Sequence, residues 1–328
     1  MGKFPLDPAE ITNYAKGSAA VDEILNSVEL TRIVADYDDE SAWAKEAQSR
    51  FKRVATQLNL SVLITAIIGS LILTIGLLEP WFEKEKFTSL LEATPKALLV
   101  LGVVGLVIGG YSAARLYELN AGDLAGSWMK SRARAENLRS EYFDRLAARA
   151  VPADAQARLM ALKIINVHLL DEQLTYFRDG TLRHERAANW WLRWAAIATG
   201  MSSIGVAAGG VAGVADKPWM AVAALGAIGA ALAAFATSQE SIGQEKVRAQ
   251  RFRNNRAALN ELARKMDDIE AAVAGASPES LVTFTSGINQ QLKLELSQFL
   301  DSAESIRASI TKLGEEIEKN EKAKGGKP

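Results

Sequence analysis

The sequence contains no cysteine, and this absence removes several kinds of chemistry. None of its 328 residues offers a thiol to form a disulfide, to act as a nucleophile, or to bind zinc or an iron–sulfur cluster. Histidine is nearly absent as well, since only His168 and His184 occur. Their separation covers about four or five turns of a helix, which is too far for one metal site. We therefore predict no bound metal, and we expect both histidines at the surface or in helix packing.

Motifs for catalysis and cofactor binding are also missing. Neither of the glycine-rich phosphate motifs, GxxxxGK[ST] and GxGxxG, occurs where a strand would lead into a helix. Carboxylates are numerous, but they alternate with Lys and Arg as they do on solvated helix faces. The formal net charge of −1 provides no general attraction for nucleic acid. We expect no catalytic residue, no cofactor and no nucleic-acid partner, and therefore not an enzyme.

What the sequence has in abundance is apolar residues, which gather in four blocks. Each block holds about 18 or more consecutive residues without a charge, enough to cross a hydrocarbon layer about 30 Å thick as a helix. Four such blocks are unusual for buried helices of a soluble protein. The sequence thus predicts four membrane spans, at residues 54–78, 97–114, 191–214 and 219–236.

The charges between the blocks predict the topology. The first connection, residues 79–96, is acidic, and the second, Asp216-Lys217-Pro218, is a tight turn. Lys and Arg concentrate at the opposite ends of the blocks, and basic flanks stay in the cytoplasm. We therefore expect two membrane hairpins, with both termini and the middle segment cytoplasmic. Tryptophans near the block ends agree with this placement: Trp81, Trp190, Trp191, Trp194 and Trp219.

The remaining segments are predicted to be helical, and residues 115–150 to continue the second span without a break. The expected fold is an all-α membrane protein: two transmembrane helical hairpins (four spans), long cytoplasmic helical extensions and a C-terminal coiled-coil helix. Its parts are an N-terminal cytoplasmic helical segment (1–50), a first two-transmembrane unit with a cytoplasmic helix (51–150), a second with a cytoplasmic coiled-coil helix (151–275), an amphipathic helix (276–320) and a disordered tail (321–328).

A heptad pattern follows the fourth block and indicates a coiled-coil seam for cytoplasmic assembly. Its residues are Phe252, Leu259, Leu262, Met266, Ile269 and Val273. The neighbouring Arg251, Arg253 and Arg256 are best explained as a basic membrane flank. Contact of these arginines with a lipid head group or phosphate is the functional alternative.

The second hairpin is rich in small residues. Its blocks are mostly Ala and Gly, so their insertion depends on packing against other helices. Glycines or alanines recur every four residues on one face of each block: Gly205, Gly209 and Gly213, then Gly226, Ala230 and Ala234. We predict that these faces pack inside the hairpin or between protomers. Thr199, Ser202 and Ser203 are the candidates for a polar pore lining; the alternative is that their hydroxyls bond helix carbonyls four residues earlier.

Several strings resemble the SLATT domains, the SMODS- and SLOG-associating two-transmembrane effector domains of prokaryotic conflict systems. SAWAKEAQSRFKRVATQLNLSVLITAIIG resembles the start of a first hairpin, WMKSRARAENLRSEYF the charged helix after it, and LLDEQLTYFRDGTLRHERAANWW the start of a second subtype. The resemblance covers roughly residues 10–275 and implies a tandem of two SLATT units. It also implies a membrane effector that opens pores when a sensor, usually a separate protein or a fused domain, is triggered.

These patterns favour a homo-oligomeric pore or channel effector of an anti-phage system, which permeabilises the inner membrane when a sensor partner is activated. The alternative is a non-conducting scaffold that recruits a soluble partner through its cytoplasmic coiled coils. A transporter is the weakest hypothesis, because no block is broken by a proline and none carries a charge that could couple transport to an ion. The expected partners are the lipid bilayer, further copies of the chain and a sensor or signal-generating protein.

Overall fold

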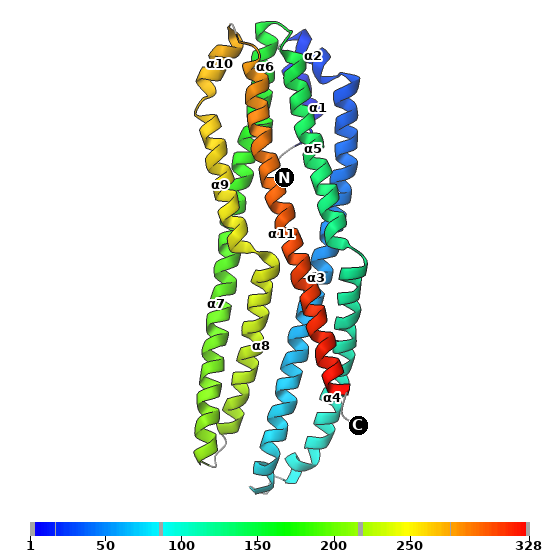
Figure 1. Cartoon of the computed structure of the whole chain (residues 1–328), viewed down its shortest axis with the longest axis vertical. Helices are drawn as coiled ribbons and strands as arrows, with labels where there is room; N and C mark the ends of the chain where they lie inside the picture. Colours follow the sequence, from blue (N-terminus) through cyan, green and yellow to red (C-terminus); the bar gives the residue numbers. More distant parts are fainter. Residues whose placement is uncertain (1–3, 17, 85–87, 216–218, 276, 326–328) are drawn as a thin grey trace. The chain divides into compact units, whose positions relative to one another are not determined.

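The computed structural model of the chain describes residues 4–16, 18–84, 88–215, 219–275 and 277–325. These residues are helical and contain no strand, so the predicted all-α class is confirmed. A π-helical turn, Asn166–Asp171, joins α6 to α7. The α-helices, coloured along the chain in Figure 1, are α1 (Pro8–Ala15), α2 (Ala19–Leu25), α3 (Val28–Lys84), α4 (Thr88–Ala121), α5 (Leu124–Ala150), α6 (Ala155–Ile165), α7 (Glu172–Ala215), α8 (Trp219–Gly243), α9 (Glu245–Ala263), α10 (Met266–Ala274) and α11 (Ser280–Gly325).

The chain forms two compact units, and each is assembled from separate stretches. Unit 1 comprises Met1–Ser49, Leu124–Glu185 and Lys246–Ala308. Unit 2 comprises Arg50–Asp123, Arg186–Glu245 and Ser309–Pro328. The sequence-based division into consecutive ranges therefore differs from the way in which the segments pack.

Helix breaks fall where the chain leaves unit 2. Asp123 and Gln244 have φ values of 39° and 46°, the left-handed conformation that interrupts a right-handed helix. Asp123 separates α4 from α5, so the prediction of one unbroken helix over residues 115–150 is wrong. The break consists of Gly122 and Asp123, and a glycine is a common signal for the end of a helix. The pattern of apolar residues continues across the break and therefore did not reveal it.

The core of unit 1 consists of large apolar side chains. Phe143, Leu146, Ile165 and Phe177 are almost completely buried in one cluster that spans α1–α3, α5–α7 and α9–α11. Burying a side chain of this size stabilises a fold by about 1.5–3 kcal/mol before entropy is counted. Unit 1 is therefore organised as an ordinary water-soluble helical bundle.

The predicted heptad seam lies inside this core. Phe252, Leu259 and Val273 are buried, and Leu262, Met266 and Ile269 are partly buried against the same cluster. The seam is also interrupted, because α9 ends at Ala263 and α10 begins at Met266. These residues thus pack within the chain.

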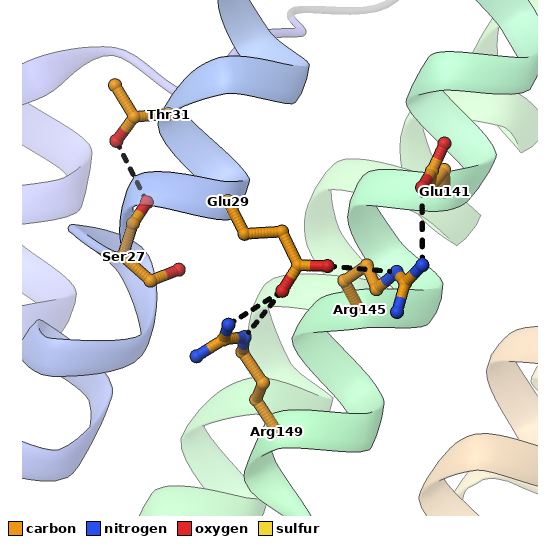
Figure 2. A network of polar contacts seen from close by, with 6 residues as sticks. All are labelled: Ser27, Glu29, Thr31, Glu141, Arg145 and Arg149. Atoms are coloured by element: carbon orange, nitrogen blue, oxygen red, sulfur yellow. Dashed lines mark hydrogen bonds and ion pairs between the residues drawn. The ribbon is translucent and has the colours of Figure 1, made fainter.

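A charged network joins the start of α3 to α5 in unit 1. Glu29 accepts hydrogen bonds from Nη2 and Nε of Arg149 at 2.6 and 3.1 Å, and its other oxygen lies 3.2 Å from Nε of Arg145 (Figure 2). Arg145 also pairs with Glu141 at 3.6 Å. The hydrogen bond from Arg149 is the main reason that the pKa of Glu29 is lowered. The acid in the first turn of α3 also interacts favourably with the helix dipole.

Unit 2 has the opposite distribution of residue sizes. Its large apolar residues are exposed, among them Leu73, Leu99, Leu106, Trp190 and Val206. Most of its buried residues are small or polar, among them Asn59, Ser61, Thr94, Ser112, Ala198, Ala208 and Ala236. Large buried side chains occur on the first hairpin: Phe51, Val54, Leu58, Ile68 and Leu119. Many of the large apolar side chains that would form the interior of a soluble bundle are nevertheless on the outside.

Two helical stretches are long and apolar enough to cross a membrane, Val28–Gly76 and Glu92–Ala150. In their most apolar 18-residue windows only 22% and 6% of the residues are buried. The third and fourth predicted spans do not meet this criterion within the described residues, where α8 contributes the shorter apolar stretch Gly226–Thr237. Residues 209–225 lie outside those whose side chains the structure describes, and the tight turn 216–218 is likewise outside.

The first hairpin, α3 and α4, is joined by a buried polar contact. The hydroxyl of Ser112 donates to that of Ser61 at 2.7 Å, and Ser61 donates to the Leu58 carbonyl at 2.8 Å. Next to it, a Cβ at Gly105 would lie 3.3 Å from the Ile68 side chain. Small residues therefore allow these two helices to approach where they meet.

Candidate functional site

The second hairpin, α7 and α8, is held by contact between backbones. A Cβ built on Gly229 would lie 2.5 Å from the backbone nitrogen of Ser202 and 2.7 Å from the Ala198 carbonyl oxygen. A Cβ on Gly226 would lie 3.1 Å from Cα of Gly205. Only hydrogen atoms fit at these points, so the two helices are as close as helices can be.

Only some of the small residues that were predicted to pack lie at the contact between α7 and α8. Gly205 and Gly226 lie at the contact, whereas Ala230 and Ala234 are exposed. Gly229 takes the place expected for Ala230: the buried positions of α8 are Gly226, Gly229 and Ala236, spaced by three and seven residues. Gly209 and Gly213 are on α7, but their surroundings lie outside the described side chains.

The three hydroxyl residues proposed for a pore lining have two different positions. Thr199 and Ser203 are exposed, and their hydroxyls donate to the carbonyls of Ala195 and Thr199 at 2.8 and 3.0 Å. Ser202 is half-buried, with its backbone at the contact with α8. The hydroxyls of Thr199 and Ser203 therefore bond carbonyls four residues earlier on their own helix, as the alternative to a pore lining predicts. Such hydroxyls are satisfied whether they face lipid, water or a neighbouring helix.

The arginines that follow the fourth block differ in their surroundings. Arg251 is buried in unit 1, and burial lowers its pKa although Glu295 opposes this effect. Arg253 forms an ion pair with Glu185 on α7. Arg256 is exposed. Of the three, Arg256 is thus the one whose charge is most accessible to a head group or phosphate.

Sequence reasoning missed a buried network around the π-helical turn of unit 1. His168 is 2% exposed, and its Nε2 lies 3.0 Å from the Tyr14 hydroxyl. Arg139 donates to the His168 carbonyl at 3.0 Å and lies 3.6 Å from a Glu172 oxygen. A signal was present, since Arg139 occupies the same helical face as Ala135, Tyr142 and Leu146, but we had weighed only the apolar residues of that face.

A second buried network lies where α11 packs against α5 and α7. The Arg132 guanidinium is 4.1 Å from the centre of the Phe299 ring. Burial acts to lower the pKa of Arg132, but the charges of Tyr176 and Glu295 outweigh it, and the pKa is raised. Burial raises the pKa of Glu295 in spite of the opposing charge of Arg132. Hydrophobic periodicity gives no signal for the burial of Glu295, because it concerns only the apolar residues of α11.

The two histidines do not meet. His184 packs its ring on Phe252 at 5.2 Å between ring centres, while His168 is in the network described above. Within the described part of the chain, no group of three His, Cys, Asp or Glu residues is arranged to hold a metal ion. The residues present are therefore suited to packing and to ion pairing.

Comparison with known proteins adds no relative: no family model, curated protein or solved structure matches the chain. The function must therefore be argued from the two units themselves. The second hairpin is the strongest candidate site, because its exposed hydroxyls and alanines lie beside a backbone contact that fixes their position.

Proposed function

We propose that the chain is a membrane-embedded pore or channel effector that acts as a homo-oligomer. In this proposal α3, α4, α7 and α8 supply four spans of the bacterial inner membrane, and both termini are cytoplasmic. A sensor or signal-generating partner activates it, as the resemblance to tandem SLATT domains implies. Conduction then permeabilises the membrane of an infected cell.

The observation that carries this proposal is the distribution of residue sizes in unit 2. A helical hairpin in water would bury Leu, Ile and Trp, because burial of apolar surface is its main source of stability. In unit 2 those residues are exposed on α7 as well as on the first hairpin, with Leu192, Ile197 and Ile204 more than half exposed. Lipid satisfies such surfaces, and helix contacts in lipid are then made by small residues. This argument extends the proposed spans to α7 and α8.

The geometry of the second hairpin favours a pore between copies. Its two helices touch along their backbones at Gly226 and Gly229, which leaves no lumen between them at that level. Thr199, Ser203, Ala230 and Ala234 are instead exposed and available to neighbouring copies. Rings of charge are not expected in such a lining, so strong ion selectivity is not expected either.

The absence of cysteine makes a direct test simple. Thr199→Cys and Ser203→Cys would each carry the sole thiol of the chain, as would the control Leu106→Cys in the first hairpin. Each variant is reconstituted in liposomes, ion flux is measured, and a charged, water-soluble methanethiosulfonate is added. We expect flux from all three, and a change in flux on modification of positions 199 and 203 alone.

In cells the activating partner should raise conduction above the basal flux that is expected in liposomes. Expression in the native host together with the neighbouring genes should cause loss of membrane potential and growth arrest on triggering. If triggering occurs without any ion flux, the chain is instead a scaffold that recruits a soluble partner. If modification changes the ion flux equally at positions 106, 199 and 203, the second hairpin does not line the pore, although the protein still conducts.

A further inference from the structure

Unit 1 contains a cavity of about 900 Å³ near the start of the chain. Residues of α1, α2 and the first turns of α3 form its walls, and Tyr142 of α5 lines it from the opposite side. Pockets that enclose drug-sized molecules have volumes of roughly 300–1,000 Å³. The cavity is therefore large enough for a small organic molecule.

Tyr142 is the polar residue of this cavity that has capacity to bind a ligand. It is 2% exposed, and its ring is packed against Phe4 and Phe143 with centres 5.0 and 5.2 Å away. Its hydroxyl has no hydrogen-bond partner among the described residues, whereas the hydroxyl of Tyr14 reaches His168 and that of Tyr37 reaches Ser41. Burial raises the pKa of Tyr142, so the group stays protonated and can donate.

The charged and amide groups around the cavity are already engaged on their own helices. Lys16 donates to the Asn13 side chain at 3.4 Å, and Asp22 accepts from Asn26 at 2.7 Å. Thr12 and Thr31 donate to carbonyls four residues earlier. Most of the remaining wall is apolar: Pro5, Leu6, Pro8, Ile11, Leu25, Leu30 and Val34. Lys16 and Asp22 are exposed and each already has a partner on its own helix, so the buried part of the wall offers a ligand apolar contacts and the Tyr142 hydroxyl.

We propose that this cavity binds an uncharged small molecule with an apolar body and one accepting oxygen, a ketone, ether or hydroxyl, to which the Tyr142 hydroxyl donates. The oxygen of the ligand would accept the hydrogen bond that the Tyr142 hydroxyl does not make to any described residue. This inference goes beyond the proposed function and does not depend on it, because every residue involved belongs to unit 1.

The test uses 2-adamantanone as the probe, with adamantane-1-carboxylate and 1-adamantylammonium as charged probes of the same body. Binding to the full chain in lipid nanodiscs is followed by ligand-observed NMR. We expect the ketone to bind, the two ions to bind at least tenfold more weakly, and Tyr142→Phe to weaken ketone binding by about tenfold, the factor that corresponds to one hydrogen bond. Ala15→Trp, which fills the cavity, should abolish binding while leaving the Tyr142 hydroxyl in place.

Tyr37→Phe is the matched control, since it removes a buried hydroxyl that has a partner. It should keep ketone binding and lower the unfolding temperature. Tyr142→Phe without ligand should unfold at the same temperature as the wild type or higher. A ketone that does not bind, that binds equally to all variants, or that is bound less tightly than the ions would overturn the proposal, as would a lowered unfolding temperature for Tyr142→Phe.

Discussion

The two units of this chain are both built from helices, but their large and small residues are exchanged. In unit 1, Phe143 and Phe177 are inside and charges such as Glu29 and Arg149 are near the surface. In unit 2, Leu106 and Val206 are outside, while Ala198 and Ser112 are inside. The proposed membrane location of unit 2 would account for this difference, because lipid satisfies exposed apolar side chains and water does not.

The comparison also separates two ways of holding helices together. Unit 1 gains stability from buried apolar area and supplements it with buried polar bonds such as those of Asn289. In unit 2 the second hairpin depends on close approach at Gly229, and the first hairpin combines the hydroxyl pair Ser61–Ser112 with the buried side chain of Ile68. Substitutions that are equivalent in chemistry should therefore have different consequences in the two units.

The largest effect is expected for Gly229→Leu in unit 2. The new side chain would collide with the backbone of Ser202, which cannot move aside as a side chain can. We expect the hairpin to lose more than about 3 kcal/mol of stability, at or above the usual upper range for overpacking. Thermal unfolding in nanodiscs, followed by circular dichroism, measures it. The control is Gly200→Leu on α7, where nothing lies within 4 Å of the new Cβ; equal unfolding of the two variants would refute the backbone contact.

The next effect tests what surrounds unit 2. Leu106 is 77% exposed in α4, and Leu106→Arg places a charge on the proposed lipid face. We expect a cost of about 2.5–3.5 kcal/mol for insertion, seen as protein lost from washed membranes. Val28→Arg is the control, since Val28 is 87% exposed in unit 1. If both variants remain in membranes to the same extent, the surface of unit 2 does not face lipid.

A smaller effect is expected inside unit 1. Asn289 is buried and donates to the Ser140 carbonyl at 3.0 Å and to Asp144 at 2.8 Å. Asn289→Ala leaves both acceptors without this donor, and we expect a loss of about 1–3 kcal/mol in the free energy of unfolding. Denaturant titration measures it, with the exposed neighbour Gln290→Ala as the control. Identical midpoints would show that the polar bond contributes nothing to the packing of α11.

The smallest effect concerns Glu29 at the surface of unit 1. Because Arg149 lowers its pKa, the folded state favours the charged carboxylate, and this stabilisation is complete above the ordinary value of 4.5. It is lost as the pH falls through the lower pKa of the folded state. We expect Glu29→Gln to reduce the acid dependence of the unfolding temperature below pH 4.5, less so at high salt. Glu141→Gln, which removes a single exposed pair with Arg145, is the control; the same change in both would contradict the network.

The sequence predicted the helical class and the positions of its apolar blocks because both depend on local patterns. The break at Gly122 and Asp123 was missed because the apolar pattern continues across it, although the glycine is a signal for a helix end. The heptad of Phe252 and Leu259 was visible, but a seam looks the same whether it packs within one chain or between copies. The pairing of Arg139 with His168 and Glu172 depends on contacts between distant segments, which periodicity does not report.

The π-helical turn Asn166–Asp171 changes the rotation of the following helix about its own axis. Such a turn accommodates one residue more than an α-helical turn, and one residue corresponds to a rotation of about 100°. Everything that follows it on α7 is therefore turned relative to a direct continuation of α6. Phe177 is 1% exposed in this setting. Deletion of one residue from the turn is expected to restore a regular helix and to rotate Phe177 out of the core. The extra residue of the turn therefore determines which face of α7 packs against the core.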